Sequence, residues 1–176
     1  SLGHGGLSFG FEFVEFVRAH RSVLVRTAVL LCAGDEGYAE DLVQTTLTKL
    51  YVAWAKVRRA DVPLAYARTS LTNTFFDECR RAHRRRELTT AEPFLADAPA
   101  HENDHALRQV VLGALRELGP SQRAVVVLRH WHDLEVAEVA RMLGCSEGNV
   151  KSQNARALAR LREVLGSELL VAAGEA

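Results

Sequence analysis

The sequence predicts an all-α fold, with two small helical domains joined by an acidic flexible linker and a helix-turn-helix in the C-terminal domain. Apolar residues recur at three- and four-residue spacing through most of the 176 residues, which is the period of amphipathic helices. A stretch with two prolines, five acids and no basic residue interrupts this pattern at residues 87–105. Near the C-terminus, a small residue, a glycine and an aliphatic residue have the spacing of two helices joined by a tight turn.

The composition excludes several classes of protein. An apolar fraction of 48% and a charged fraction of 25% are ordinary for a soluble domain, and no apolar run reaches the roughly 18 residues of a membrane span. The cysteines, Cys32, Cys79 and Cys145, are far apart and form no C-x-x-C pair, as expected in a reducing cytoplasm. The net charge of zero is a cancellation, because basic residues exceed acidic ones in residues 1–86 and residues 87–105 are purely acidic.

The first domain is expected to span residues 8–86. After the opening SLGHGG, which we set aside, a helix is predicted from about Phe9 to Cys32 and a second from about Asp35 to Trp54. Pro63 suits the first turn of a third helix, which runs into the arginine cluster RRAHRRR at residues 80–86. Residues 87–105 then form the linker.

The second domain is expected to span residues 106–166, followed by a short tail at 167–176. Its helical periodicity resumes near Ala106, breaks at Gly119-Pro120 and returns as far as Trp131. Asp133 is predicted to N-cap a short helix that ends at Leu143, and Ser146 is predicted to cap a last helix of up to twenty residues.

Three residues of this last helix pair have the spacing of a helix-turn-helix. Ala140 is small enough for a helix crossing, Gly144 suits a left-handed turn, and Val150 packs back from the second helix. No acid occurs between residues 148 and 162, and the polar side chains there suit base edges and phosphates in a major groove. These candidates for DNA contact are Asn149, Lys151, Ser152, Asn154 and Arg156.

Three segments together resemble the bacterial group 4, or extracytoplasmic-function, sigma factors of RNA polymerase. They are AEDLVQTTLTKLYVAW (residues 39–54), PLAYARTSLTNTFFDECRR (63–81) and ALRELGPSQRAVVVLRHWHDLEVAEVARMLGCSEGNVKSQNARALARLR (114–162). The ending is most similar to the actinobacterial, sigma-E-like branch, and 19 arginines against 3 lysines fit a GC-rich genome. The resemblance implies a cytoplasmic protein of the nucleoid that is not an enzyme and uses no cofactor or metal. It would direct core RNA polymerase to promoters and could be held by an anti-sigma factor.

The resemblance also implies roles for particular residues of the first domain. Asp41, Leu42, Gln44 and Leu47 match the stretch that binds the β′ clamp helices of the polymerase, whereas the second domain would meet the β flap. The helix from Pro63 and the loop before it match the part that opens DNA at the minus-ten element. The residues implied in minus-ten binding are Arg58, Arg59, Asn73, Arg80, Arg81, Arg84 and Arg85.

Two departures from the family pattern and the acidic linker carry further expectations. Tyr66 stands where many relatives have Trp, so a core role and a DNA role for it stay equally open. Asn149 opens the stretch that matches the minus-35 reader, where relatives often have Thr, which indicates a shifted promoter preference. The linker matches the segment that threads the polymerase near its active centre, where its acids would mimic nucleic acid.

Two short stretches resemble metal sites. The motifs also leave two alternative functions open, a zinc hydrolase and an autonomous helix-turn-helix regulator. HENDH (His101–His105) has the H-E-x-x-H form of a zinc hydrolase, but it follows Ala-Pro-Ala and lacks an apolar flank, so Asn103 or Asp104 is better read as a helix N-cap. On one helix, His130 and His132 would diverge by about 200° and could not chelate one ion. The other alternative is an autonomous helix-turn-helix regulator. Such a regulator would need neither the polymerase-binding helix nor the single-strand pocket that are expected within residues 35–86.

Overall fold

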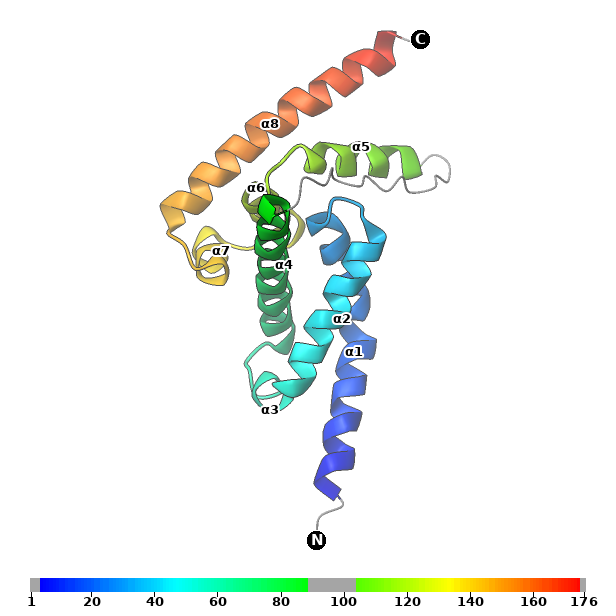
Figure 1. The fold of residues 1–176 in the computed structure, drawn as a ribbon, viewed down its shortest axis with the longest axis vertical. Coiled ribbons are helices and arrows are strands. Elements are labelled where there is room, and N and C mark those ends of the chain that lie inside the picture. The colour runs from blue at the N-terminus through cyan, green and yellow to red at the C-terminus, as the bar shows by residue number, and fades with distance from the viewer. Residues whose placement is uncertain (1–3, 89–103, 175–176) are drawn as a thin grey trace.

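The computed structural model describes residues 4–88 and 104–174, with side chains described within residues 8–85 and 105–166. Over these ranges the chain forms helices and no strand, as predicted. Figure 1 shows their arrangement. The helices are α1 (His4–Leu31), α2 (Glu36–Val52), α3 (Trp54–Val57), α4 (Pro63–Leu88), α5 (Asp104–Arg116), α6 (Pro120–Val126), the π-helical turn η1 (Val127–Trp131), α7 (Val136–Leu143) and α8 (Glu147–Gly174).

The first half of the chain is a bundle in which α1, α2 and α4 pack against one another. Their inner faces carry fully buried side chains such as Leu24, Leu50 and Leu71, at the helical spacing seen in the sequence. The turn between α1 and α2 uses Asp35, whose carboxylate accepts a hydrogen bond from the backbone N–H of Tyr38 at 2.9 Å. This bond caps α2 at the residue where the sequence predicts its start.

The second half is built around the predicted helix-turn-helix. Val125, Leu128, Val139 and Val150 form its own buried cluster, so α6, η1, α7 and α8 hold each other. Gly144 ends α7 with a φ of +63°, the left-handed conformation that glycine adopts without strain. The Ser146 hydroxyl accepts from the N–H of Asn149 at 3.1 Å and caps α8, which confirms this part of the prediction.

The prediction that Asp133 N-caps the short helix is wrong. α7 begins at Val136, behind Glu135, whose side chain makes no capping bond. Asp133 instead has a φ of +52° and turns the chain after η1. Aspartate tolerates this conformation better than most residues, because its short polar side chain bonds locally.

Two other boundaries differ from the expected ones. α8 runs for 28 residues to Gly174, past the expected limit of about twenty, so most of the predicted tail is helical. α4 continues through Leu88 and α5 begins at Asp104, so each end of the predicted linker is a helix end. Residues 89–103, with the rest of that linker and most of HENDH, lie outside the described residues.

The two halves share one hydrophobic core. Leu112, Leu115 and Leu118 from the second half are buried in the same cluster as Leu31 and Cys32 at the end of α1. α7 packs against α4, and α6 and η1 pack against α1. The sequence predicts two domains but gives no sign of this docking, since the contacts join residues about a hundred positions apart.

Candidate nucleic-acid interface

The helix-turn-helix presents the predicted polar face to solvent. Asn149, Lys151, Ser152 and Arg156 are exposed on the first turns of α8, while Val150 and Ala157 point into the core. This division puts hydrogen-bond donors on the side that a DNA groove would meet. The underside of α8 is fixed by Val150, which has no exposed surface.

Asn154 is the half-buried member of this set. Its side-chain oxygen lies 3.0 Å from Nε2 of His130, the residue next to Trp131 at the end of η1. The ring N–H donates to this oxygen, so the amide NH₂ of Asn154 is not used in this bond. Asn154 also lines an adjacent hollow of about 400 Å³. Arg162 and Lys151 line the same hollow, and Arg162 is a residue that the sequence reading missed although it follows the same helical spacing.

A second polar surface lies along α4, where Asn73 is exposed. Asn73 lines a pocket of about 360 Å³ together with Tyr66 and Lys49. The Lys49 ammonium donates to the Thr74 hydroxyl at 3.1 Å and lies 3.7 Å from an Asp77 carboxylate oxygen, so it is held at the pocket wall.

Tyr66 also lines a second pocket, of about 540 Å³, next to the loop between α3 and α4. Lys56 and Arg59 line this pocket too, and the Lys56 ammonium lies 5.8 Å from the centroid of the Tyr66 ring. A cation at this distance from an aromatic face is favourable. Tyr66 is therefore half-buried between two basic pockets, which gives it both a packing role and an accessible face.

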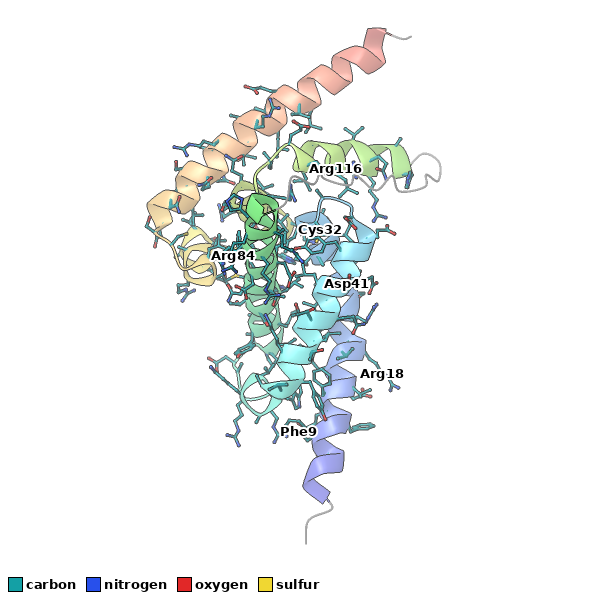
Figure 2. All side chains as sticks on the ribbon, in the orientation of Figure 1. Phe9, Arg18, Cys32, Asp41, Arg84 and Arg116 are labelled. Atoms are coloured by element: carbon teal, nitrogen blue, oxygen red, sulfur yellow. The ribbon has the colours of Figure 1, made fainter. Side chains whose placement is uncertain are left out.

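The predicted phosphate-binding arginines are exposed, and several of them pair with carboxylates. Arg80 and Arg81 bond to Asp77 and Glu78 one turn earlier on α4, and Arg58 pairs with Glu12 of α1 at 2.9 Å. These pairs are exposed, so each contributes little and a phosphate can replace the carboxylate. Arg84 (labelled in Figure 2) and Arg85 are also exposed, whereas the side chain of Arg86 lies outside the described part.

Only half of the predicted polymerase-binding set reaches the surface. Asp41 and Gln44 are exposed on the outer face of α2, but Leu42 is 1% exposed and Leu47 9% exposed, both within the core. Leucines at helical spacing can either pack in the protein's own core or bind a partner. Here both leucines pack in the core that α2 forms with α1 and α4. Val52 at the end of α2, which the sequence did not single out, is 82% exposed.

The two histidines of the stretch RHWHDLE (residues 129–135), which resembled a metal site in the sequence, contact different partners. His130 bonds to Asn154 of α8, whereas Nε2 of His132 lies 2.8 Å from the Thr27 hydroxyl of α1. The side chains diverge, as the helical spacing predicts. Among the described residues, which exclude His101 to Asn103, no group of three His, Cys, Asp or Glu could hold a metal ion. His105, the described histidine of HENDH, contacts Gln109. No helix in the described ranges has the length and apolarity to cross a bilayer.

Both halves match known protein families. Residues 16–85 match sigma-70 region 2, and residues 108–161 match sigma-70 region 4. RNA polymerase sigma-E factors of Streptomyces avermitilis and Streptomyces coelicolor are each 40% identical, over 94% and 88% of this chain and 90% and 86% of theirs. The ECF RNA polymerase sigma factor SigM of Mycobacterium tuberculosis is 33% identical over 89% of this chain and 78% of its own length.

Solved structures share the whole fold. The sigma factor RpoE of Bartonella quintana, in complex with the anti-sigma factor NepR, has a TM-score of 0.74 and 27% identity over 88% of this chain and 97% of that one. CnrH, in complex with the cytosolic domain of CnrY, has a TM-score of 0.60 at 23% identity, covers 88% of each chain, and shows the same fold. The chain thus belongs to the extracytoplasmic-function sigma factors of the sigma-70 family, which direct promoter-specific initiation of transcription.

Proposed function

We propose that this sigma factor reads the minus-35 element with α8, and reads and traps melted minus-ten DNA with α4. The observation that carries the second part is the position of Tyr66 between two pockets lined by Asn73, Lys49 and Arg59. Capture of an unstacked base requires an aromatic face, an amide for its hydrogen-bonding edge and cations for the flanking phosphates. All three are present on one surface of the first half.

At the minus-ten element the basic side chains have separate tasks. Lys56 and Arg59 at the pocket hold the strand beside the captured base, whereas Arg80, Arg81, Arg84 and Arg85 lie further along α4 and follow the backbone. Arg58 is paired with Glu12 and joins the phosphate contacts by exchanging that partner. Because phosphate contacts position the DNA and base contacts specify it, Asn73 is the residue expected to set sequence preference.

At the minus-35 element α8 enters the major groove by its first turns. Asn149, Lys151 and Ser152 lead, and Asn154 and Arg156 follow on the same face. Asn149 suits adenine, because its amide matches the N6 and N7 positions of that base. Arg156 and Lys151 provide guanine or phosphate contacts.

The polymerase contact is assigned to the outer face of α2. Asp41 and Gln44 would meet the β′ clamp helices, with Leu42 and Leu47 acting by holding α2 in place from beneath. Region 2 then spans residues 8–86, the linker 87–105 threads the polymerase, and region 4 spans residues 106–166 and meets the β flap. The protein would act in the cytoplasm at the nucleoid without catalysis of its own. An anti-sigma factor is a further partner, as the complex of RpoE with the anti-sigma factor NepR suggests.

Transcription by core polymerase from a library with randomised minus-35 and minus-ten boxes tests this assignment. With the wild-type protein, transcripts should be enriched for one pair of boxes. Asn149→Ala should change the selected minus-35 sequence alone, and Asn73→Ala the minus-ten sequence alone. The assignment fails if either variant changes the other box, or if the wild-type protein selects no sequence.

A further inference from the structure

A hollow of about 650 Å³, which we call the α5 hollow, lies between α5 and the ends of α1 and α2 that meet at their turn (Figure 1). It reaches Trp131 at the end of η1, so both halves of the chain line it. Most of its lining residues are apolar, and none of them is assigned to promoter DNA or to core polymerase. A mostly apolar hollow of this size is typical of small-molecule sites, which measure about 300–1,000 Å³.

Three large apolar side chains of this lining are left uncovered by the described parts of the chain. Leu107 is 69% exposed and Val111 is 41% exposed, and because they lie four residues apart they share one side of α5. The ring of Trp131 is 56% exposed. A contiguous apolar patch of this kind, with charged residues around it, marks a surface that binds an apolar group.

The charged residues of the lining leave one arginine for a ligand. Glu36 pairs with Arg108 at 3.4 Å, and Glu40 pairs with Arg21 at 2.8 Å. Arg26 on α1 is exposed and forms no hydrogen bond or ion pair with any described residue. Both acids of the hollow are thus neutralised within the protein, whereas the Arg26 guanidinium is available. A guanidinium matches the two oxygens of a carboxylate better than any other common anion of that size.

We propose that the α5 hollow binds a small amphipathic carboxylic acid, whose apolar body packs on Leu107, Val111 and Trp131 and whose carboxylate binds Arg26. The volume favours a small molecule over a partner helix, because a helix about 10 Å across exceeds about 650 Å³ within two turns. The charge favours an acid over a base, since a cation would meet Arg26 while both glutamates are already paired.

Titration of the full-length chain with decanoate tests the site, and Trp131 supplies the signal. The chain has two tryptophans, and Trp54 is only 3% exposed, so a ligand in the hollow changes the emission of Trp131. Decanoate, kept below the concentration at which it forms micelles, should shift this emission to the blue and saturate at one molecule per chain. Trp131→Phe should lose the signal, while titration calorimetry still detects binding. Absence of saturable binding overturns the proposal.

The length of the acid tests the apolar part of the site. Each buried methylene should tighten binding about fourfold, so decanoate should bind about fifteenfold more tightly than octanoate. Leu107→Ser, at an exposed position on which the fold does not depend, should weaken decanoate binding about fivefold or more. The matched control is Val62→Ser, because Val62 is 58% exposed and lies outside the hollow. Equal affinities for the two acids, or equal losses in the two variants, contradict an apolar site.

The head group of the ligand tests Arg26. The wild type should bind decanoate more tightly than decanol, and decylamine least. Arg26→Glu should reverse the order of decanoate and decylamine, which a folding defect cannot imitate. The matched control is Arg18→Glu, because Arg18 is an exposed arginine two turns earlier on α1 and lies outside the hollow (Figure 2). It should keep the wild-type order. An unchanged order in Arg26→Glu, or the same reversal in Arg18→Glu, overturns the assignment of the carboxylate to Arg26.

Discussion

At the scale of single residues, the fold uses a few side chains in ways that their sequence neighbours do not reveal. Tyr66 divides two basic pockets, and its ring is the one aromatic face that both pockets share among the described residues. Thr27 is fully buried and donates its hydroxyl hydrogen to the Val23 carbonyl at 2.8 Å. Its oxygen must therefore accept from Nε2 of His132, which fixes the tautomer of that histidine.

Removal of the Tyr66 ring should weaken binding of minus-ten DNA. Stacking of a base on an aromatic side chain is worth about 1–3 kcal/mol, so Tyr66→Ala should lower the affinity of the holoenzyme for a single-stranded minus-ten oligonucleotide by about fivefold to 150-fold. Tyr66→Phe should retain most of it. Tyr51→Ala is the control, because Tyr51 is a more exposed tyrosine of the same half that lines neither pocket and packs on Phe13 of α1. Equal affinities for wild type and Tyr66→Ala would assign Tyr66 to packing alone.

His132 should make docking of the halves depend on pH. Burial, and then the nearby Arg68 of α4, lower the pKa of His132 from 6.5 to about 4, while the Thr27 hydroxyl that faces it from α1 carries no charge. Docking needs the neutral ring, whereas the ring of a molecule whose halves have separated titrates at its ordinary pKa. Docking is thus complete above about pH 6.5 and weakens as the pH falls toward 4.

The measurement is the distance between spin labels at Val52→Cys on α2 and Ala137→Cys on α7, in full-length protein whose native cysteines are replaced by alanine. As the pH is lowered from about 7.5 to about 5, the wild type should gain a population of molecules with longer and more broadly distributed label-to-label distances. His132→Gln keeps a donor near Thr27 and should show no such change. The same broadening in His132→Gln would assign the pH dependence to other groups.

At the scale of elements, the sequence predicts those helix ends that are determined by interactions between residues close together in the chain. Asp35, Gly144 and Ser146 act at helix ends within three residues of themselves, and their roles were predictable. The π-helical turn and Asp133 were not, because the His132 side chain is held by Thr27, 105 positions earlier. Leu42 and Leu47 show the same limit, since periodicity identifies an apolar face but not what covers it.

The serine that caps α8 and the serine that we propose to face DNA should have separable effects. Ser146→Ala removes the acceptor for the Asn149 N–H and should lower the free energy of unfolding by about 1 kcal/mol. Ser152→Ala, six residues along the same helix, should leave stability unchanged but weaken binding of minus-35 duplex. Thermal unfolding and duplex titration of both variants check this, and a stability loss in Ser152→Ala would contradict the assignment of its side chain to an exposed face.

At the scale of the whole molecule, the sequence predicts the two helical domains but not their docking. The resemblance to sigma factors rests on three sequence segments, and each segment lies within a single half of the molecule. The contacts that join the halves, from Arg116 and Arg123 to carbonyls of α1, depend on backbone atoms that any residue could supply. A pattern of side chains cannot indicate which backbone carbonyls will accept these hydrogen bonds. In the sequence, Arg116 looks like an ordinary arginine at the end of a helix.

To act as proposed, this chain must give core polymerase the ability to open promoter DNA. Permanganate probing of unpaired thymines, on a promoter selected from the randomised library, measures this most directly. Core polymerase with the wild-type chain should make thymines reactive around the minus-ten box, and Tyr66→Ala should reduce that reactivity. No reactive thymines beyond those that core polymerase gives alone would contradict the account.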